Sequence, residues 1–167
     1  MAKAVFLDRD ETLNPDPGYI HDPELFNLFP WVASELKKLK DAGFMLIVVS
    51  NQSGIGRGLI REASLRAIHE KCDALLTEAA GIKIDSYEFC PHRPDENCDC
   101  RKPNPKLITE SLRKFSIDPS QSYMIGDRAS DFEAGTRAGL KQSFQIPSGS
   151  EEAFKKAVAE ILESGSR

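Results

Sequence analysis

Two carboxylates, Asp8 and Asp10, lie one residue apart directly after the apolar run at residues 4–7. The run is typical of a buried strand, and in open α/β sheets ligands bind at the carboxyl ends of the strands. Two carboxylates at such an edge can hold a divalent cation and divide the chemistry, one attacking as a nucleophile and the other moving a proton. A solvated turn after a strand is the alternative for this segment taken alone, so the rest of the chain has to decide.

Further polar groups lie directly after later strand-like segments or directly before a helix-like segment. They are Ser50 and Asn51 after residues 44–49, Arg101 and Lys102 before a helix, and Asp127, Arg128 and Asp131 after residues 122–125. Because parallel strands open onto a common edge, these groups are expected to converge on Asp8 and Asp10. Mg²⁺ prefers oxygen ligands, and a cation with Lys102 would stabilise charge on a phosphoryl group. The set therefore suits hydrolysis of a phosphate monoester through an aspartyl phosphate.

The elements that must position these residues alternate between strand and helix. Strands are predicted at residues 4–7, 44–49, 84–89, 122–125 and 142–146, and helices at 31–41, 62–80, 105–115, 130–138 and around 154–162. The alternation predicts an α/β fold: a Rossmann-like three-layer α/β/α sandwich with a mostly parallel sheet and no large cap domain. Asn104 is expected to cap the third helix with Pro105 as its first residue, and residues 14–29 form a long loop.

Length and charge set limits on the class of protein. The chain has 167 residues, expected to form a single domain, and its net charge of −4 gives no basic field, so neither nucleic acid nor a membrane surface is the expected partner. The longest apolar run, residues 44–49, is too short to cross a bilayer, and the N-terminus lacks the features of a signal peptide. We expect a cytoplasmic monomer that acts on a small phosphorylated metabolite.

One loop combines three of the four cysteines with a histidine. The candidate ligands are Cys90, His92, Cys98 and Cys100. Four soft or borderline ligands suffice for a closed tetrahedral Zn²⁺ site, which is structural because catalytic zinc needs an open position. A zinc loop at residues 90–103 would fix Arg101 and Lys102 at the mouth of the site. Free surface thiols and a nucleic-acid-binding zinc ribbon are the alternatives, and the acidic character of the loop opposes the second. Cys72 is expected in the core, and His69 on the exposed side of its helix.

The motifs together resemble the haloacid dehalogenase superfamily of phosphohydrolases, over residues 6 to 131. The matching segments are Phe6-Leu7-Asp8-Arg9-Asp10-x-Thr12, Ser50-Asn51-Gln52, Lys102 and Gly126-Asp127-x-x-x-Asp131. The segments Cys90-Pro91-His92 and Cys98-Asp99-Cys100-Arg101-Lys102-Pro103 resemble the branch that contains heptose-bisphosphate and histidinol-phosphate phosphatases.

The resemblance implies a role for each catalytic residue. Asp8 would be the nucleophile and Asp10 the acid and base. Ser50 and Lys102 would steady the phosphoryl group. Mg²⁺ would be held by the Asp8 side chain, the Asp10 carbonyl and Asp127.

Two segments resemble the heptose-bisphosphate branch, and this resemblance implies which ester is cleaved. The loop at residues 16–21 could contact a sugar, and the glycine-rich turn at residues 51–58 could meet a second phosphate. The substrate contacts expected from these segments and their surroundings are Asp16, Gly18, Tyr19, Asn51, Gln52, Ser53, Arg57, Arg101 and Arg128. Heptose bisphosphate is favoured, whereas the short spacing between His92 and Cys98 resembles the histidinol-phosphate branch, which is the alternative.

Glu11 departs from the resemblance, because the families usually have glycine after the second aspartate. Its carboxylate is expected to point away from an anionic substrate. Two non-enzyme alternatives remain at this point: a phospho-accepting receiver domain, whose lysine would have to follow the last acidic motif, and a catalytically weak zinc-stabilised scaffold.

Overall fold

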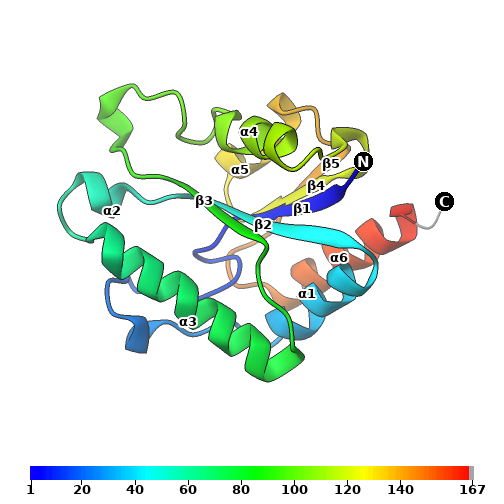
Figure 1. The fold of residues 1–167 in the computed structure, drawn as a ribbon, viewed down its shortest axis with the longest axis horizontal. Helices are drawn as coiled ribbons and strands as arrows, with labels where there is room; N and C mark the ends of the chain where they lie inside the picture. Colours follow the sequence, from blue (N-terminus) through cyan, green and yellow to red (C-terminus); the bar gives the residue numbers. More distant parts are fainter. Residues whose placement is uncertain (166–167) are drawn as a thin grey trace.

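Five parallel strands form the centre of the molecule, in the order β3-β2-β1-β4-β5, in the computed structural model, which describes residues 1–165 (Figure 1). The strands are β1 Lys3–Leu7, β2 Phe44–Asn51, β3 Ser86–Cys90, β4 Tyr123–Gly126 and β5 Gln142–Gln145. The helices are α1 Val32–Asp41, α2 Ser53–Gly56, α3 Glu62–Ala80, α4 Lys106–Lys114, α5 Ala129–Arg137 and α6 Glu151–Gly165, with 3₁₀ turns at Pro23–Leu25, Pro94–Glu96 and Pro119–Gln121.

Helices cover both faces of the sheet, with α1, α3 and α6 on one face and α4 and α5 on the other (Figure 1). Alternate residues of a strand point to opposite faces. Val5 and Leu7 accordingly pack with the α1, α3 and α6 side, whereas Ala4 and Phe6 pack with α4 and α5. The predicted three-layer α/β fold with a parallel sheet is confirmed, and residues 1–165 contain no separate cap domain.

Strand order places a switch point beside β1. The chain passes from β1 through α1 to β2 on one side, and later returns through α4 to β4 on the other side. Crevices that bind ligands form outside the carboxyl ends of the strands at such a point. The fold therefore presents the residues that follow β1 and β4 to a common crevice.

Two predictions about the ends of elements are wrong because side chains form hydrogen bonds that the local sequence pattern does not show. The third strand begins at Ser86 and not at residue 84, since the carboxylate of Asp85 accepts a hydrogen bond from the Leu46 N–H at 2.8 Å. Asn104 does not cap α4, which begins at Lys106 with Pro105 at the N-cap. The Asn104 amide instead donates to the Cys98 carbonyl at 3.4 Å.

The expected exposure of His69 is also wrong. Its ring stacks on Tyr87 of β3 with centroids 4.0 Å apart, and its Nε2 is buried without a hydrogen-bond partner. Cys72 lies in the core, as predicted. Within residues 1–165, no helix has both the length and the apolar character needed to cross a membrane.

Candidate active site

Lys102 is the buried cation of the crevice at the switch point. Its Nζ lies 2.8 Å from Asp8 Oδ1, 2.6 Å from Asp131 Oδ1 and 2.6 Å from the carbonyl of Val49. Burial opposes the charge of the amine, but Asp8 and Asp131 outweigh it and raise the pKa of Lys102. Lys102 is thus a permanent positive charge at the end of β1.

Three carboxylates cluster beside Lys102, which forms ion pairs with two of them. Oxygens of Asp8, Asp127 and Asp131 all lie within 4.8 Å of one another. Burial, together with Asp8 and Asp131 nearby, raises the pKa of Asp127 to about 7. Such a cluster of oxygen ligands fits a hard divalent cation such as Mg²⁺.

Asp10 occupies a different environment from Asp8. Arg9 donates to its two oxygens from Nε at 3.0 Å and Nη2 at 3.2 Å, Asn14 donates at 3.0 Å, and Gln52 at 3.3 Å. Burial acts to raise the pKa of Asp10, but the charge of Arg9 and these hydrogen bonds lower it overall. Asp10 is therefore held in one orientation by side chains from three positions of the chain, Arg9, Asn14 and Gln52.

A cavity of about 340 Å³ opens over these groups. Its lining includes all nine residues expected to contact substrate, together with Asp8, Asp10 and Lys102. Ser50 is buried beneath it and its hydroxyl accepts from Gln52 at 3.3 Å. Two of the nine also serve the site's framework: Gln52 binds Arg9 and Asp10, and Asn51 clamps the backbone of Lys102 through bonds of 3.0 and 3.2 Å.

Some residues of the site were not singled out from the sequence. Arg9 is 1% exposed and orients Asp10. The motif showed an arginine between two aspartates, but not that this arginine is buried or that it binds Asp10. Asp131 belonged to the motif, but its ion pair with Lys102 depends on the fold. Pro94 and Ser130 also line the cavity without any signal of their own, and Gly54 does so from the glycine-rich turn at residues 51–58.

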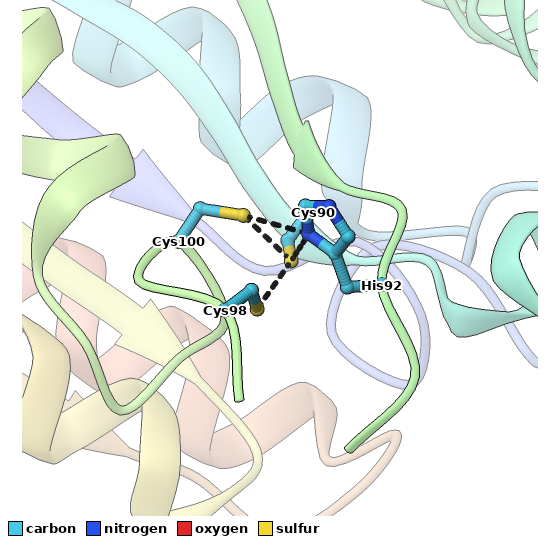
Figure 2. A group of neighbouring side chains, drawn as sticks. All are labelled: Cys90, His92, Cys98 and Cys100. Atoms are coloured by element: carbon cyan, nitrogen blue, oxygen red, sulfur yellow. Dashed lines mark hydrogen bonds between the residues drawn. The ribbon is translucent and has the colours of Figure 1, made fainter. Parts of the chain in front are cut away.

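The four candidate zinc ligands face one another, as Figure 2 shows. Cys90 Sγ lies 2.8 Å from Cys100 Sγ and 3.6 Å from Cys98 Sγ, and His92 Nδ1 lies 3.2 Å from Cys100 Sγ. Desolvation acts to raise the pKa of Cys98, but the backbone N–H of Arg101 and the Cys90 thiol, among other groups, lower it to about 7. The set of three sulfur donors and one imidazole nitrogen fits a closed Zn²⁺ site.

The cluster is connected directly to the crevice. Arg101 and Lys102 follow Cys100 without a break, and the N–H of Gln52 donates to the Cys90 carbonyl at 2.8 Å. On the other side, the N–H of Gly56 donates to the Pro91 carbonyl at 2.9 Å. The loop therefore links the ligand cluster to both α2 and Lys102.

The fold and the site together define the class of the protein as a HAD-like phosphohydrolase. The family model described as HAD-hydrolase-like matches residues 99–159. The structure resembles that of D,D-heptose 1,7-bisphosphate phosphatase from B. bronchiseptica complexed with magnesium and phosphate, with a TM-score of 0.87 and 28% identity over 97% of this chain and 99% of that one.

Sequence relatives give the particular family. D-glycero-β-D-manno-heptose-1,7-bisphosphate 7-phosphatase of Haemophilus ducreyi is 41% identical over 153 residues, 88% of this chain and 84% of its own length. The enzyme of that name from Pasteurella multocida is 37% identical over 98% of this chain and 93% of its own. The chain belongs to this family of phosphatases. The predicted superfamily and branch are confirmed, and the receiver-domain alternative is wrong.

Proposed function

We propose that the chain removes the 7-phosphate of D-glycero-β-D-manno-heptose 1,7-bisphosphate. One observation carries the proposal: Asp8, paired with Lys102, lies in a cavity whose lining also holds three arginines. They are Arg57, Arg101 and Arg128. A monoester needs cationic groups for one phosphate only, whereas these side chains can receive a second. The enzymes of H. ducreyi and P. multocida bear this substrate in their names.

The proposal gives a role to each side chain around the reacting phosphate. A carboxylate oxygen of Asp8 attacks phosphorus, and Lys102 stabilises the charge on the phosphoryl oxygens. Asp10 protonates the leaving alkoxide, and then takes a proton from the water that hydrolyses the aspartyl phosphate. Ser50 and Asn51 support the groups that line the crevice.

Mg²⁺ would be held by the side chains of Asp8 and Asp127, which belong to the carboxylate cluster, and by the backbone carbonyl of Asp10. When bound, it supplies positive charge that offsets the repulsion between a carboxylate and a phosphate. The fit rests on the oxygen atoms within 4.8 Å of one another and on the raised pKa of Asp127.

The test compares kcat/KM for heptose 1,7-bisphosphate with that for histidinol phosphate, the alternative substrate, in buffer with Mg²⁺. A preference for the bisphosphate of tenfold corresponds to about 1.4 kcal/mol of transition-state binding. Asp8→Asn should lose nearly all turnover. Asp41→Asn, at an exposed ion pair with Lys37 on α1, should keep it. Equal or higher kcat/KM for histidinol phosphate would reject the substrate proposed here.

Zinc is proposed at the four-ligand cluster, as a structural ion. The double variant Cys98→Ala, Cys100→Ala should lose bound zinc, measured by mass spectrometry, and should raise KM because Arg101 and Lys102 follow the cluster. Replacement of Cys72, a core thiol outside the cluster, by Ser serves as the control for zinc content. A double variant that is zinc-free and fully active would contradict the structural role.

The location of the protein in the cell and its oligomeric state remain predictions. A cytosolic location is consistent with the free cysteines among residues 1–165. Light scattering should give the mass of one chain.

A further inference from the structure

Glu11 has an unusual backbone for its residue type. Its φ is +65°, in the left-handed region that favours glycine. The backbone is held there by two hydrogen bonds: the Glu11 N–H donates to the Asn14 carbonyl at 2.7 Å, and the Glu11 carbonyl accepts from the Gly149 N–H at 3.0 Å. A glutamate at such a position costs stability relative to glycine, so its side chain invites an explanation.

The side chain of Glu11 joins two loops. Its Oε1 accepts a hydrogen bond from the Asp16 N–H at 2.7 Å, and its Oε2 accepts one from the Ser148 hydroxyl. Asp16 Oδ1 in turn accepts from the Gly18 N–H at 2.9 Å. Glu11 is not among the residues that line the cavity. Its carboxylate forms hydrogen bonds with the two loops and does not point at the substrate site.

The loop that Glu11 holds forms one wall of the cavity. Asp16, Gly18 and Tyr19 all line it. Gly18 and Tyr19 have φ values of +110° and +46°, so this wall has no regular backbone to keep it in place. The ring of Tyr19 packs against Gly54, where an added Cβ would lie 2.9 Å from the ring. Glu11 at one end and Gly54 at the other fix the wall.

We propose that Glu11 is a positioning residue for substrate selection: it orders the loop at residues 16–19 so that the loop contacts the part of the substrate beyond the reacting phosphate. The inference rests on the proposed function, because the wall matters only for a substrate that extends past one phosphate. A small aryl phosphate ends before the wall and depends less on Glu11.

The kinetic test uses Glu11→Ala and Glu11→Gln with heptose 1,7-bisphosphate and p-nitrophenyl phosphate. In Glu11→Ala the ratio of kcat/KM for the bisphosphate to that for the aryl ester should fall about tenfold, mainly through KM. Glu11→Gln keeps an acceptor for the Asp16 N–H and should restore most of the ratio. Glu152→Ala, at an exposed glutamate of α6, is the matched control and should keep the wild-type ratio. An unchanged ratio in Glu11→Ala would overturn the inference.

A second measurement is independent of the substrate. Hydrogen exchange at the Asp16 and Gly18 amides should become faster in Glu11→Ala, with little change in the strands. Glu11→Gly relieves the backbone and should remain as stable to heat as the wild type, yet show the same fall in ratio and the same faster exchange. Unchanged exchange at Asp16 overturns the inference whatever the substrate. A wild-type enzyme without preference for the bisphosphate contradicts the proposed function instead, and faster exchange at Asp16 would still support the ordering role of Glu11.

Discussion

Arg9 supplies its charge to only one of the two aspartates that flank it in sequence. The guanidinium lies against Asp10 and above the ring of Phe26, 5.9 Å from the ring centroid, and it is almost completely buried. Asp8 is paired with Lys102 instead. Each carboxylate thus has its own cation, and the charge of Arg9 with the surrounding hydrogen bonds lowers the pKa of Asp10 against the opposing effect of burial.

Arg9→Met should move the acid–base behaviour of Asp10. Burial, which acts to raise the pKa of Asp10, remains in the variant, while the cation that lowers it is gone. The limb of the kcat/KM profile that belongs to Asp10 should therefore shift to higher pH. Loss of an outer partner of this kind typically reduces activity about 10- to 100-fold.

The pH profile of Arg9→Met is read against Arg9→Lys, which keeps a positive charge but not the two-pronged contact. The lysine variant should lose activity with a smaller displacement of the limb. A profile for Arg9→Met that overlies the wild-type profile would show that Arg9 does not set the pKa of Asp10.

At the scale of single residues, the sequence predicted which residues form the candidate site better than it predicted the hydrogen bonds between them. Residue types and motif order were enough to name Asp8, Lys102 and the residues around the cavity. The hydrogen bonds that join Gln52 to Arg9 and to Asp10 span 43 and 42 residues of sequence, and no local pattern reports such contacts. For the same reason the reach of Glu11 to Ser148 could not be foreseen.

At the scale of elements, the short helix α2 and the zinc-ligand loop form one unit. Gly56 is the point of closest approach, since an added Cβ would lie 2.7 Å from the Pro91 carbonyl oxygen and 3.2 Å from the Arg93 nitrogen. No side chain fits in that space. Only glycine at position 56 therefore allows the backbone of α2 to lie this close to the loop. Arg57, which lines the cavity, is the next residue.

Gly56→Ala should push α2 away from the loop and displace Arg57 with it. Overpacking of this kind typically costs about 1–3 kcal/mol of stability. KM for the bisphosphate should rise severalfold while the protein still folds, which thermal unfolding would verify. Gly58→Asn is the control, since nothing lies within 4 Å of that position and asparagine tolerates its positive φ. Equal KM values for Gly56→Ala and the wild type would separate α2 from substrate binding.

The elements themselves were largely predictable, because hydrophobic periodicity depends on local sequence. Continuous apolar residues indicated β2, and a single stripe indicated α3. The errors fell where a side chain forms a hydrogen bond outside its own element, as Asp85 does with the Leu46 N–H and Asn104 does with the Cys98 carbonyl. Periodicity carries no information about such bonds.

The whole molecule is organised by the position of β4 on the opposite side of β1 from β2. Alternation of strands and helices predicted the three layers and the common edge, but not this order. The order decides the chemistry, because it brings Asp127 after β4 beside Asp8 after β1. Both cores, one on each face of the sheet, stabilise that arrangement.

His69 ties a helix of one layer to the edge of the sheet and makes the stability of the fold depend on pH. It lies on α3 and stacks on Tyr87 of β3. Burial and the charge of Arg9 lower the pKa of His69 from 6.5 to about 4. Between these values the unfolded chain holds a proton that the folded chain does not, so the free energy of unfolding falls as the pH is lowered through this window.

His69→Phe should remove this part of the pH dependence while it keeps the stacked ring. Between pH 7 and pH 5 the wild type should lose about 1–2 kcal/mol more stability than the variant, given the size of the shift and the partial exposure of the ring. Urea unfolding at several pH values, with zinc present throughout, measures both proteins under the same titration of all other groups. Parallel curves across the window would mean that His69 takes up its proton in the folded state as readily as in the unfolded one, and the link between α3 and β3 would then carry no pH dependence.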